Sequence, residues 1–224
     1  MHTRAPIARL ARSMKVLLFG AMGVSVMTLP VSLETARRAR AYLADPGQES
    51  RFLAAAGTQN LLTSLTIGLT VPIGVLTMIW MLRMARNHQT MGRYHPNWAP
   101  GWAIGGWFCP PVLQVIPWLM LRELWKASDP QCAPFDDSWR KRPVSPITTV
   151  WWVLYGLAPI LGLVLTFRRL NLGTTFDQRS VARVLDAPAS LTITTSLISL
   201  AAAAAFLTLV HQLSARHRKL VGEE

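Results

Sequence analysis

Four stretches of the sequence contain no charged residue over 18 to 22 positions, and they constrain the fold more than any other feature. They cover residues 16–33, 61–82, 147–167 and 190–210. A helix rises about 1.5 Å per residue, so each stretch is long enough to cross the roughly 30 Å hydrocarbon core of a bilayer. The sequence therefore predicts an all-α integral membrane protein with four transmembrane helices, in which residues 1–224 form a single membrane domain.

The first stretch follows four basic residues within positions 1–15, as the core of a signal peptide would. Its 18 residues exceed a typical signal core, and residues 34–38 make a poor small-residue cleavage site. We therefore expect it to remain as an uncleaved span. We expect residues 34–60 to form a solvated connector with a turn at Asp45, Pro46 and Gly47. A second polar connector is expected at 168–189, with a short helix at 179–185.

Residues 102–121 also lack charge, but their chemistry argues against a fifth span. Glycine in a helix interior costs about 1 kcal/mol and proline about 3 kcal/mol, and this segment has Gly105–Gly106 and Pro110–Pro111. Lipid cannot satisfy the backbone groups that two prolines leave unpaired. We expect residues 98–126 to form a Trp-rich segment, interfacial or re-entrant, that is broken near 109–111. Helix at 119–126 should end before Pro130.

The distribution of Lys and Arg supports the same topology. If 102–121 does not cross the bilayer, 15 of these residues fall on one side and 8 on the other. If it crosses, the division is 11 against 12, which gives no orientation. The positive-inside rule then predicts a multi-pass protein of the cell (inner or plasma) membrane with both termini in the cytoplasm.

All nine tryptophans lie between positions 80 and 152, within a longer ordered pattern. The pattern comprises Arg86, Asn87, Gly92, Trp98, Gly101, Trp102, Gly105, Gly106, Trp107, Pro110, Pro117, Glu123, Trp125 and Ser128. It resembles a family of bacterial membrane proteins catalogued as domain of unknown function 4328, over about residues 60–213. The family usually has asparagine and arginine where this chain has Leu113 and Ile116. The resemblance implies a multi-span membrane protein and brings no known activity.

The formal net charge of +12 would point to nucleic acid in a soluble protein. Here most basic residues flank the apolar stretches, as Lys15, Arg83 and Arg169 do. Such residues anchor spans and attract anionic lipid headgroups. We therefore expect the lipid bilayer and anionic headgroups as partners, and no nucleic acid.

No pattern of residues predicts a catalytic, cofactor or metal site. His88, His95 and His211 would lie on one side of the membrane in the four-span topology, but they lack a ligand spacing. We expect the histidines to be solvated at the interface. No charge lies within the four stretches, which counts against an ion-coupled transporter.

Two acidic residues, Glu123 and Asp129, lie next to the apolar part of the pattern. We expect salt bridges with Arg122, Lys126 and Arg86, which would fix the amphipathic helix to the base of the second span.

Three functions remain open. The first is a non-enzymatic membrane component that binds a partner membrane protein, a second copy of the chain or lipid through residues 83–146, the 83–146 face. The second is a small channel or transporter with a re-entrant segment, whose pore the Thr- and Ser-rich fourth span could line. The third is a membrane-interface enzyme that uses His95, Glu123 or Asp129. We expect the first.

Overall fold

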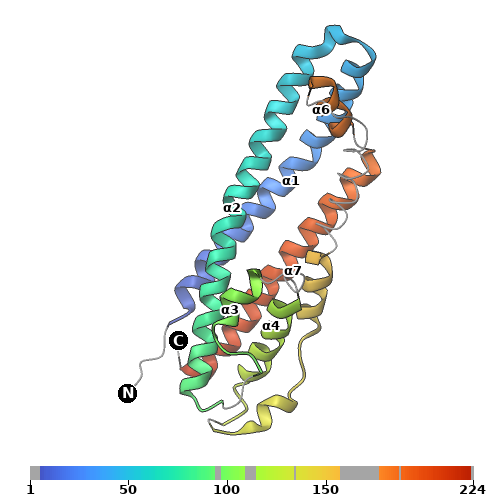
Figure 1. The fold of residues 1–224 in the computed structure, drawn as a ribbon. Helices are drawn as coiled ribbons and strands as arrows, with labels where there is room; N and C mark the ends of the chain where they lie inside the picture. Colours follow the sequence, from blue (N-terminus) through green and yellow to red (C-terminus); the bar gives the residue numbers. More distant parts are fainter. Residues whose placement is uncertain are drawn as a thin grey trace. The chain divides into compact units, whose positions relative to one another are not determined.

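The computed structural model describes residues 6–93, 97–108, 115–133, 135–156, 177–186 and 188–222. Within these ranges the chain is all-α and has no strand, which confirms the predicted class. The elements are α1 (Ala8–Ala44), η1 (Pro46–Gln48), α2 (Glu49–Thr90), α3 (Trp102–Gly105), η2 (Gly106–Phe108), α4 (Val115–Ala127), η3 (Asp137–Lys141), α6 (Gln178–Leu185) and α7 (Ala189–Val221) (Figure 1). Residues 146–156 form a further helix.

Three helices in the described part of the chain are long and apolar enough to cross a membrane: α1, α2 and α7. They contain the predicted spans 16–33, 61–82 and 190–210. Many of their large apolar side chains are exposed, as at Phe19, Ile67 and Leu197. These features indicate a membrane-embedded protein. The fourth predicted span, 147–167, begins in helix 146–156 and continues outside the described residues, so the count of four stays a prediction.

The prediction of a solvated connector over 34–60 is wrong. α1 continues to Ala44 and α2 begins at Glu49, so the connection consists of residues 45–48. The charged residues there support a helix, since Arg38 Nε donates to Glu34 Oε1 at 2.6 Å across one helical turn. The turn itself is where it was expected, and the Asp45 side chain accepts a hydrogen bond from the Gly47 backbone.

The Trp-rich segment is described on both sides of its predicted break. One piece ends with η2 at Phe108, and α4 begins at Val115. The break at 109–111 lies outside the described residues, and whether the segment lies at the interface stays a prediction. α4 contains the expected helix 119–126 and ends at Ala127. α6 confirms the expected short helix, and the Asp177 side chain caps it by accepting from the Ser180 backbone.

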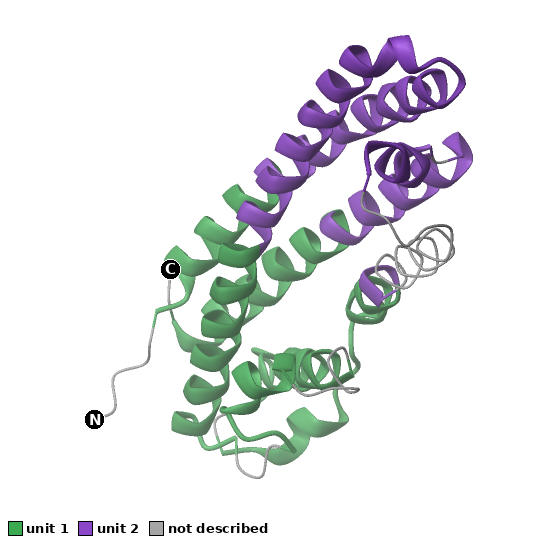
Figure 2. Cartoon of the chain, turned by 45° about the horizontal axis from the view of Figure 1, so that its top comes forward, with its two compact units in different colours: residues 1–19, 71–153, 204–224 green, residues 20–70, 154–203 purple. Residues whose placement is uncertain are grey.

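The chain groups into two compact units (Figure 2). Unit 2 comprises residues 20–70 and 154–203. Tyr42 and Phe52 stack there with ring centroids 5.2 Å apart, and Ala39 and Ala182 complete a small buried cluster.

Unit 1 comprises residues 1–19, 71–153 and 204–224. Its fully buried side chains include Met14, Trp80, Met84, Leu121 and Leu213. The Trp-rich pieces and the 83–146 face belong to this unit.

Candidate functional site

Four polar side chains meet in the interior of unit 1: Asn87 and His88 of α2, Ser128 just after α4, and His217 of α7. Each is at most 5% exposed. The Ser128 hydroxyl lies 3.2 Å from His88 Nε2 and 3.3 Å from His217 Nδ1. Asn87 Nδ2 lies 3.1 Å from His217 Nε2, and the two imidazoles meet edge to face at 4.9 Å. The four groups connect three helical segments that are far apart in the sequence.

The chemistry of these groups gives the network a direction. An amide nitrogen can only donate, so His217 Nε2 accepts from Asn87 and its proton resides on Nδ1. His217 Nδ1 then donates to the Ser128 oxygen, and the Ser128 hydroxyl donates to His88 Nε2. The remaining proton of a neutral His88 is therefore on Nδ1.

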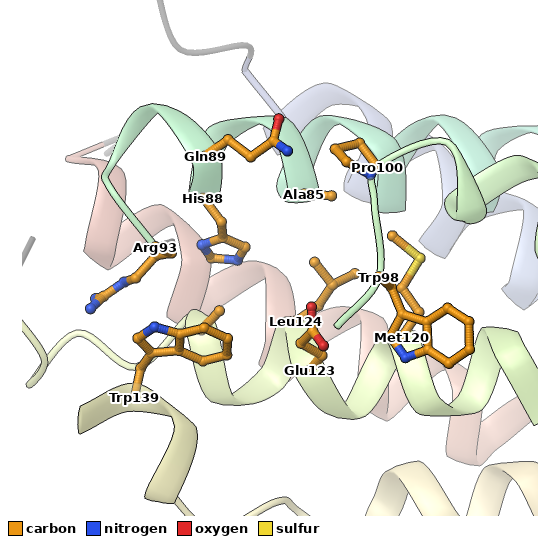
Figure 3. Close-up of a pocket in the computed structure, with 11 residues that line it drawn as sticks. Ala85, His88, Gln89, Arg93, Trp98, Pro100, Met120, Glu123, Leu124 and Trp139 are labelled. Atoms are coloured by element: carbon orange, nitrogen blue, oxygen red, sulfur yellow. The ribbon is translucent and has the colours of Figure 1, made fainter. Parts of the chain in front are cut away.

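His88 Nδ1 is buried without a hydrogen-bond partner within the described residues. Its ring lies at a small cavity of about 20 Å³, whose wall also includes Trp98, Glu123 and Trp139 (Figure 3). A volume above roughly 10–15 Å³ holds one water molecule when polar groups are present to bind it. The volume of this cavity is therefore sufficient for one water molecule.

Glu123 differs from an ordinary surface carboxylate. Burial raises its pKa above the usual 4.5, and hydrogen bonds from the Asn97 and Trp98 backbone oppose this shift. The Asn97 N–H donates to Glu123 Oε2 at 3.0 Å. The hydrogen bond fixes the carboxyl group beside the cavity.

We expect Glu123→Gln to stabilise the protein at neutral pH. The raised pKa means that the folded state binds the Glu123 proton more tightly than the unfolded state, so the wild type loses stability as pH rises from 4.5 through the folded-state pKa. Glutamine resembles the protonated form of Glu123 and cannot ionise, so the variant does not lose stability as the pH rises. Thermal unfolding in detergent from pH 4 to 8 measures the effect, with Asp137→Asn as an exposed control. A difference that is independent of pH would contradict the prediction.

A buried arginine holds the segment that follows α4. Arg93 is 2% exposed, and its guanidinium donates to the carbonyls of Ala133, Asp136 and Cys132 at 2.8 to 3.1 Å. Just before it, Gly92 has a φ of +67°, and a Cβ there would overlap the Phe135 ring. Glycine adopts a positive φ without steric cost, so Gly92 allows the chain to leave α2 beneath this ring.

The ion pairs of Asp129 differ from those predicted. Its carboxylate pairs with Arg142 Nε at 3.5 Å and Arg216 Nη2 at 3.3 Å. The guanidinium of Arg216 also covers the Trp125 ring at 4.9 Å from its centre. The predicted partner Arg86 is exposed on α2. Asp129 and Arg216 are far apart in the sequence, so the sequence alone could not predict that α7 supplies a cation to the end of α4.

A second, larger pocket of about 200 Å³ opens beside Glu123. Leu119, Arg122, Glu123 and Lys126 line it from positions three and four apart, which is one face of α4. Asn97, Trp98, Trp139 and Arg140 complete its wall. The Lys126 ammonium donates a hydrogen bond to the Arg140 carbonyl at 3.0 Å. This bond connects α4 to η3 at the pocket.

The structure brings together only some residues of the sequence pattern. Asn87 and Ser128 meet in the buried network, and Gly106 is buried where a Cβ would lie 2.5 Å from Ile116 Cγ2. Trp98 and Trp102 meet edge to face with centroids 5.8 Å apart. Pro117 and Trp125 are buried, Trp107 is half-buried, and Arg86, Gly101 and Gly105 are exposed. Pro110 and His95 lie outside the described residues.

The expectation that the histidines are solvated is wrong for His88 and His217, whereas His211 is exposed. No sequence signal pointed to His217 as a partner of Asn87, since 130 residues separate them. Within the described ranges, no three His, Cys, Asp or Glu side chains form a group that could hold a metal ion.

The family model described as Domain of unknown function (DUF4328) matches residues 44–215. The chain belongs to the DUF4328 family. The matched range contains Asn87, His88 and Ser128, and it ends two residues before His217. The buried network of this DUF4328 protein therefore joins matched residues to one beyond the match. Comparisons with curated proteins and with solved structures found no match.

Proposed function

We propose that this DUF4328 protein is a non-enzymatic membrane component that binds anionic lipid headgroups through its 83–146 face. The observation that carries the proposal is the pocket of about 200 Å³ with three cations, Arg122, Lys126 and Arg140, in its wall. One carboxyl group, Glu123, also lines the pocket, so the three cations outnumber it. Arginine and lysine donate to phosphate oxygens in charge-assisted hydrogen bonds, so the pocket suits a lipid phosphodiester.

Apolar side chains next to this pocket support a bilayer partner. Trp98 lines the pocket and contacts Trp102, which is 39% exposed. Ile104 and Phe108 are 40% and 68% exposed on the same short helical piece. Tryptophan favours headgroup depth because its ring is apolar and its N–H is polar. In the proposal these side chains enter the interface of the cytoplasmic leaflet, which is the side on which the predicted four-span topology has both termini.

The proposal predicts which residues determine headgroup preference. Each Lys or Arg near an anionic membrane surface contributes about 1 kcal/mol, so the triple variant Arg122→Gln, Lys126→Gln, Arg140→Gln should lose at least about tenfold in affinity. Native mass spectrometry with added phosphatidylglycerol or phosphatidylcholine measures the number of bound lipids. The wild type should retain phosphatidylglycerol preferentially, and the triple variant should not.

The matched control is the triple variant Arg37→Gln, Arg51→Gln, Arg179→Gln, which removes three exposed cations outside the pocket. It should keep the preference of the wild type for phosphatidylglycerol. Equal loss in both triple variants would mean that only total charge matters, and unchanged binding in the pocket variant would exclude this face. If a polypeptide co-purifies with the wild type and is lost only from the pocket variant, the partner of this face is a protein and not a lipid.

A channel or transporter is the second candidate, favoured by a cavity of about 290 Å³ within unit 2. Its polar lining consists of Thr28, Ser32, Thr35, Gln59, Thr192, Thr195 and Ser196. Uncharged oxygens of this kind bind small polar solutes or cations. Solute flux in proteoliposomes that changes on Gln59→Leu would support this function, and an absence of flux across a broad panel of solutes would exclude it.

A further inference from the structure

A third cavity of unit 1, of about 90 Å³, lies between the first turns of α1 and the last turns of α7. Ala8, Ala11, Arg12 and Lys15 line it from α1, and His211, Ser214 and Arg218 line it from α7. Both sets are spaced by three and four residues, so each is one face of its helix. The small side chains of Ala8 and Ala11 leave the space that the longer side chains surround.

Among the residues that the structure describes, the polar side chains that line this cavity include three cations and no carboxyl group. Arg12, Lys15 and Arg218 contribute the positive charges, and the imidazole of His211 adds a further polar group. Arg12 is exposed, and Lys15 and Arg218 are half-buried. Like charges around one pocket repel one another, and an anion between them removes this cost. The cavity therefore favours a negatively charged occupant.

Ser214 adds a buried donor to this arrangement. It is 4% exposed, and its oxygen accepts a hydrogen bond from Trp80 Nε1 at 3.1 Å. A hydroxyl that accepts from an indole retains its own proton for donation. The indole of Trp80 is fully buried, so it holds the Ser214 oxygen in place at the cavity.

We propose that this cavity binds one phosphate-type anion, with Arg12, Lys15 and Arg218 as its charge partners and Ser214 as a neutral donor. Arginine and lysine donate charge-assisted hydrogen bonds to phosphate oxygens, and donors on two helices can contact several oxygens of one phosphate group. The phosphate belongs either to a lipid headgroup or to a free phosphate. The site shares no residue with the pocket at Arg122, Lys126 and Arg140. This proposal therefore does not depend on the proposed function.

Two variants distinguish binding at a defined site from attraction of anions by the net charge of the protein. The double variant Lys15→Gln, Arg218→Gln removes two charges from the cavity. Ala8→Leu keeps every charge and fills the space between the helices. If the cavity is a site, both should weaken anion binding by about tenfold or more, whereas attraction by net charge would leave Ala8→Leu equal to the wild type.

Two probes distinguish the sources of the phosphate. Inorganic phosphate, compared with chloride at equal ionic strength, should raise the apparent unfolding temperature of the purified protein if the anion is free. Native mass spectrometry with phosphatidylglycerol should show one lipid, retained by the triple variant at Arg122, Lys126 and Arg140, if the anion is a headgroup. Loss of either signal in both cavity variants supports the site. The proposal is overturned if neither probe binds, or if Ala8→Leu binds as the wild type does.

Discussion

Replacing His217 with phenylalanine should cost about 3 kcal/mol of stability, since a buried polar group that loses its partner costs about 1–3 kcal/mol and two groups are affected. The ring of phenylalanine fills most of the space, but it cannot accept from Asn87 or donate to Ser128. The apparent unfolding temperature in detergent, compared with the wild type at one heating rate, measures the loss.

His211→Phe is the matched control for this substitution, because His211 is an exposed histidine of the same helix. It should leave the unfolding temperature close to that of the wild type. Combining His217→Phe with Ser128→Ala should cost less than the two single changes together, because the second change removes a group that the first left unpaired. Strict additivity would mean that the side chains do not act as one network.

Replacing Arg93 with methionine should be similarly costly, at about 3 kcal/mol, since three carbonyls lose charge-assisted donors. Methionine preserves the apolar stem and removes the guanidinium that binds Cys132, Ala133 and Asp136. The substitution should weaken the local structure of the loop around Phe135 as well as the overall stability of the protein. Phe135 N–H donates to the Met91 carbonyl at 3.2 Å, and this bond depends on the same docking of the loop.

Hydrogen exchange of residues 131–136 measures that local effect, with Arg86→Met as the control because Arg86 is exposed on the same helix. Exchange should rise in Arg93→Met and stay unchanged in Arg86→Met. Arg93→Lys should restore only part of the protection, since an ammonium lacks the planar fork that reaches carbonyls in several directions. Unchanged protection in Arg93→Met would show that other contacts hold the loop.

The long helices could be predicted from the sequence, and their full lengths could not. Apolar stretches located the centres of α1, α2 and α7, because the length needed to cross a bilayer is a strong constraint. The C-terminal end of α1 and the N-terminal end of α2 are polar and charged, a composition that is also typical of loops. They are helical because Glu34 and Arg38 pair across a turn and the apolar Tyr42 and Phe52 stack within unit 2.

The buried network was only half visible in the sequence. Asn87 and Ser128 belonged to the family pattern, but nothing in their spacing pairs them with His88 and His217. Solvated histidines were the default because the sequence placed each one near a basic, polar segment. Burial of His217 follows from the packing of α7 in unit 1, which is a tertiary property that local composition does not encode.

The direction of the hydrogen bonds has a consequence for His88 Nδ1. If the Asn87 side chain turned over, its oxygen would face His217 Nε2 and require a proton there. Every proton along the series would then shift to the opposite partner, and His88 Nδ1 would carry a lone pair in place of a proton. Whether this buried nitrogen is a donor or an acceptor is thus decided by the rotation of one amide at the far end of the series.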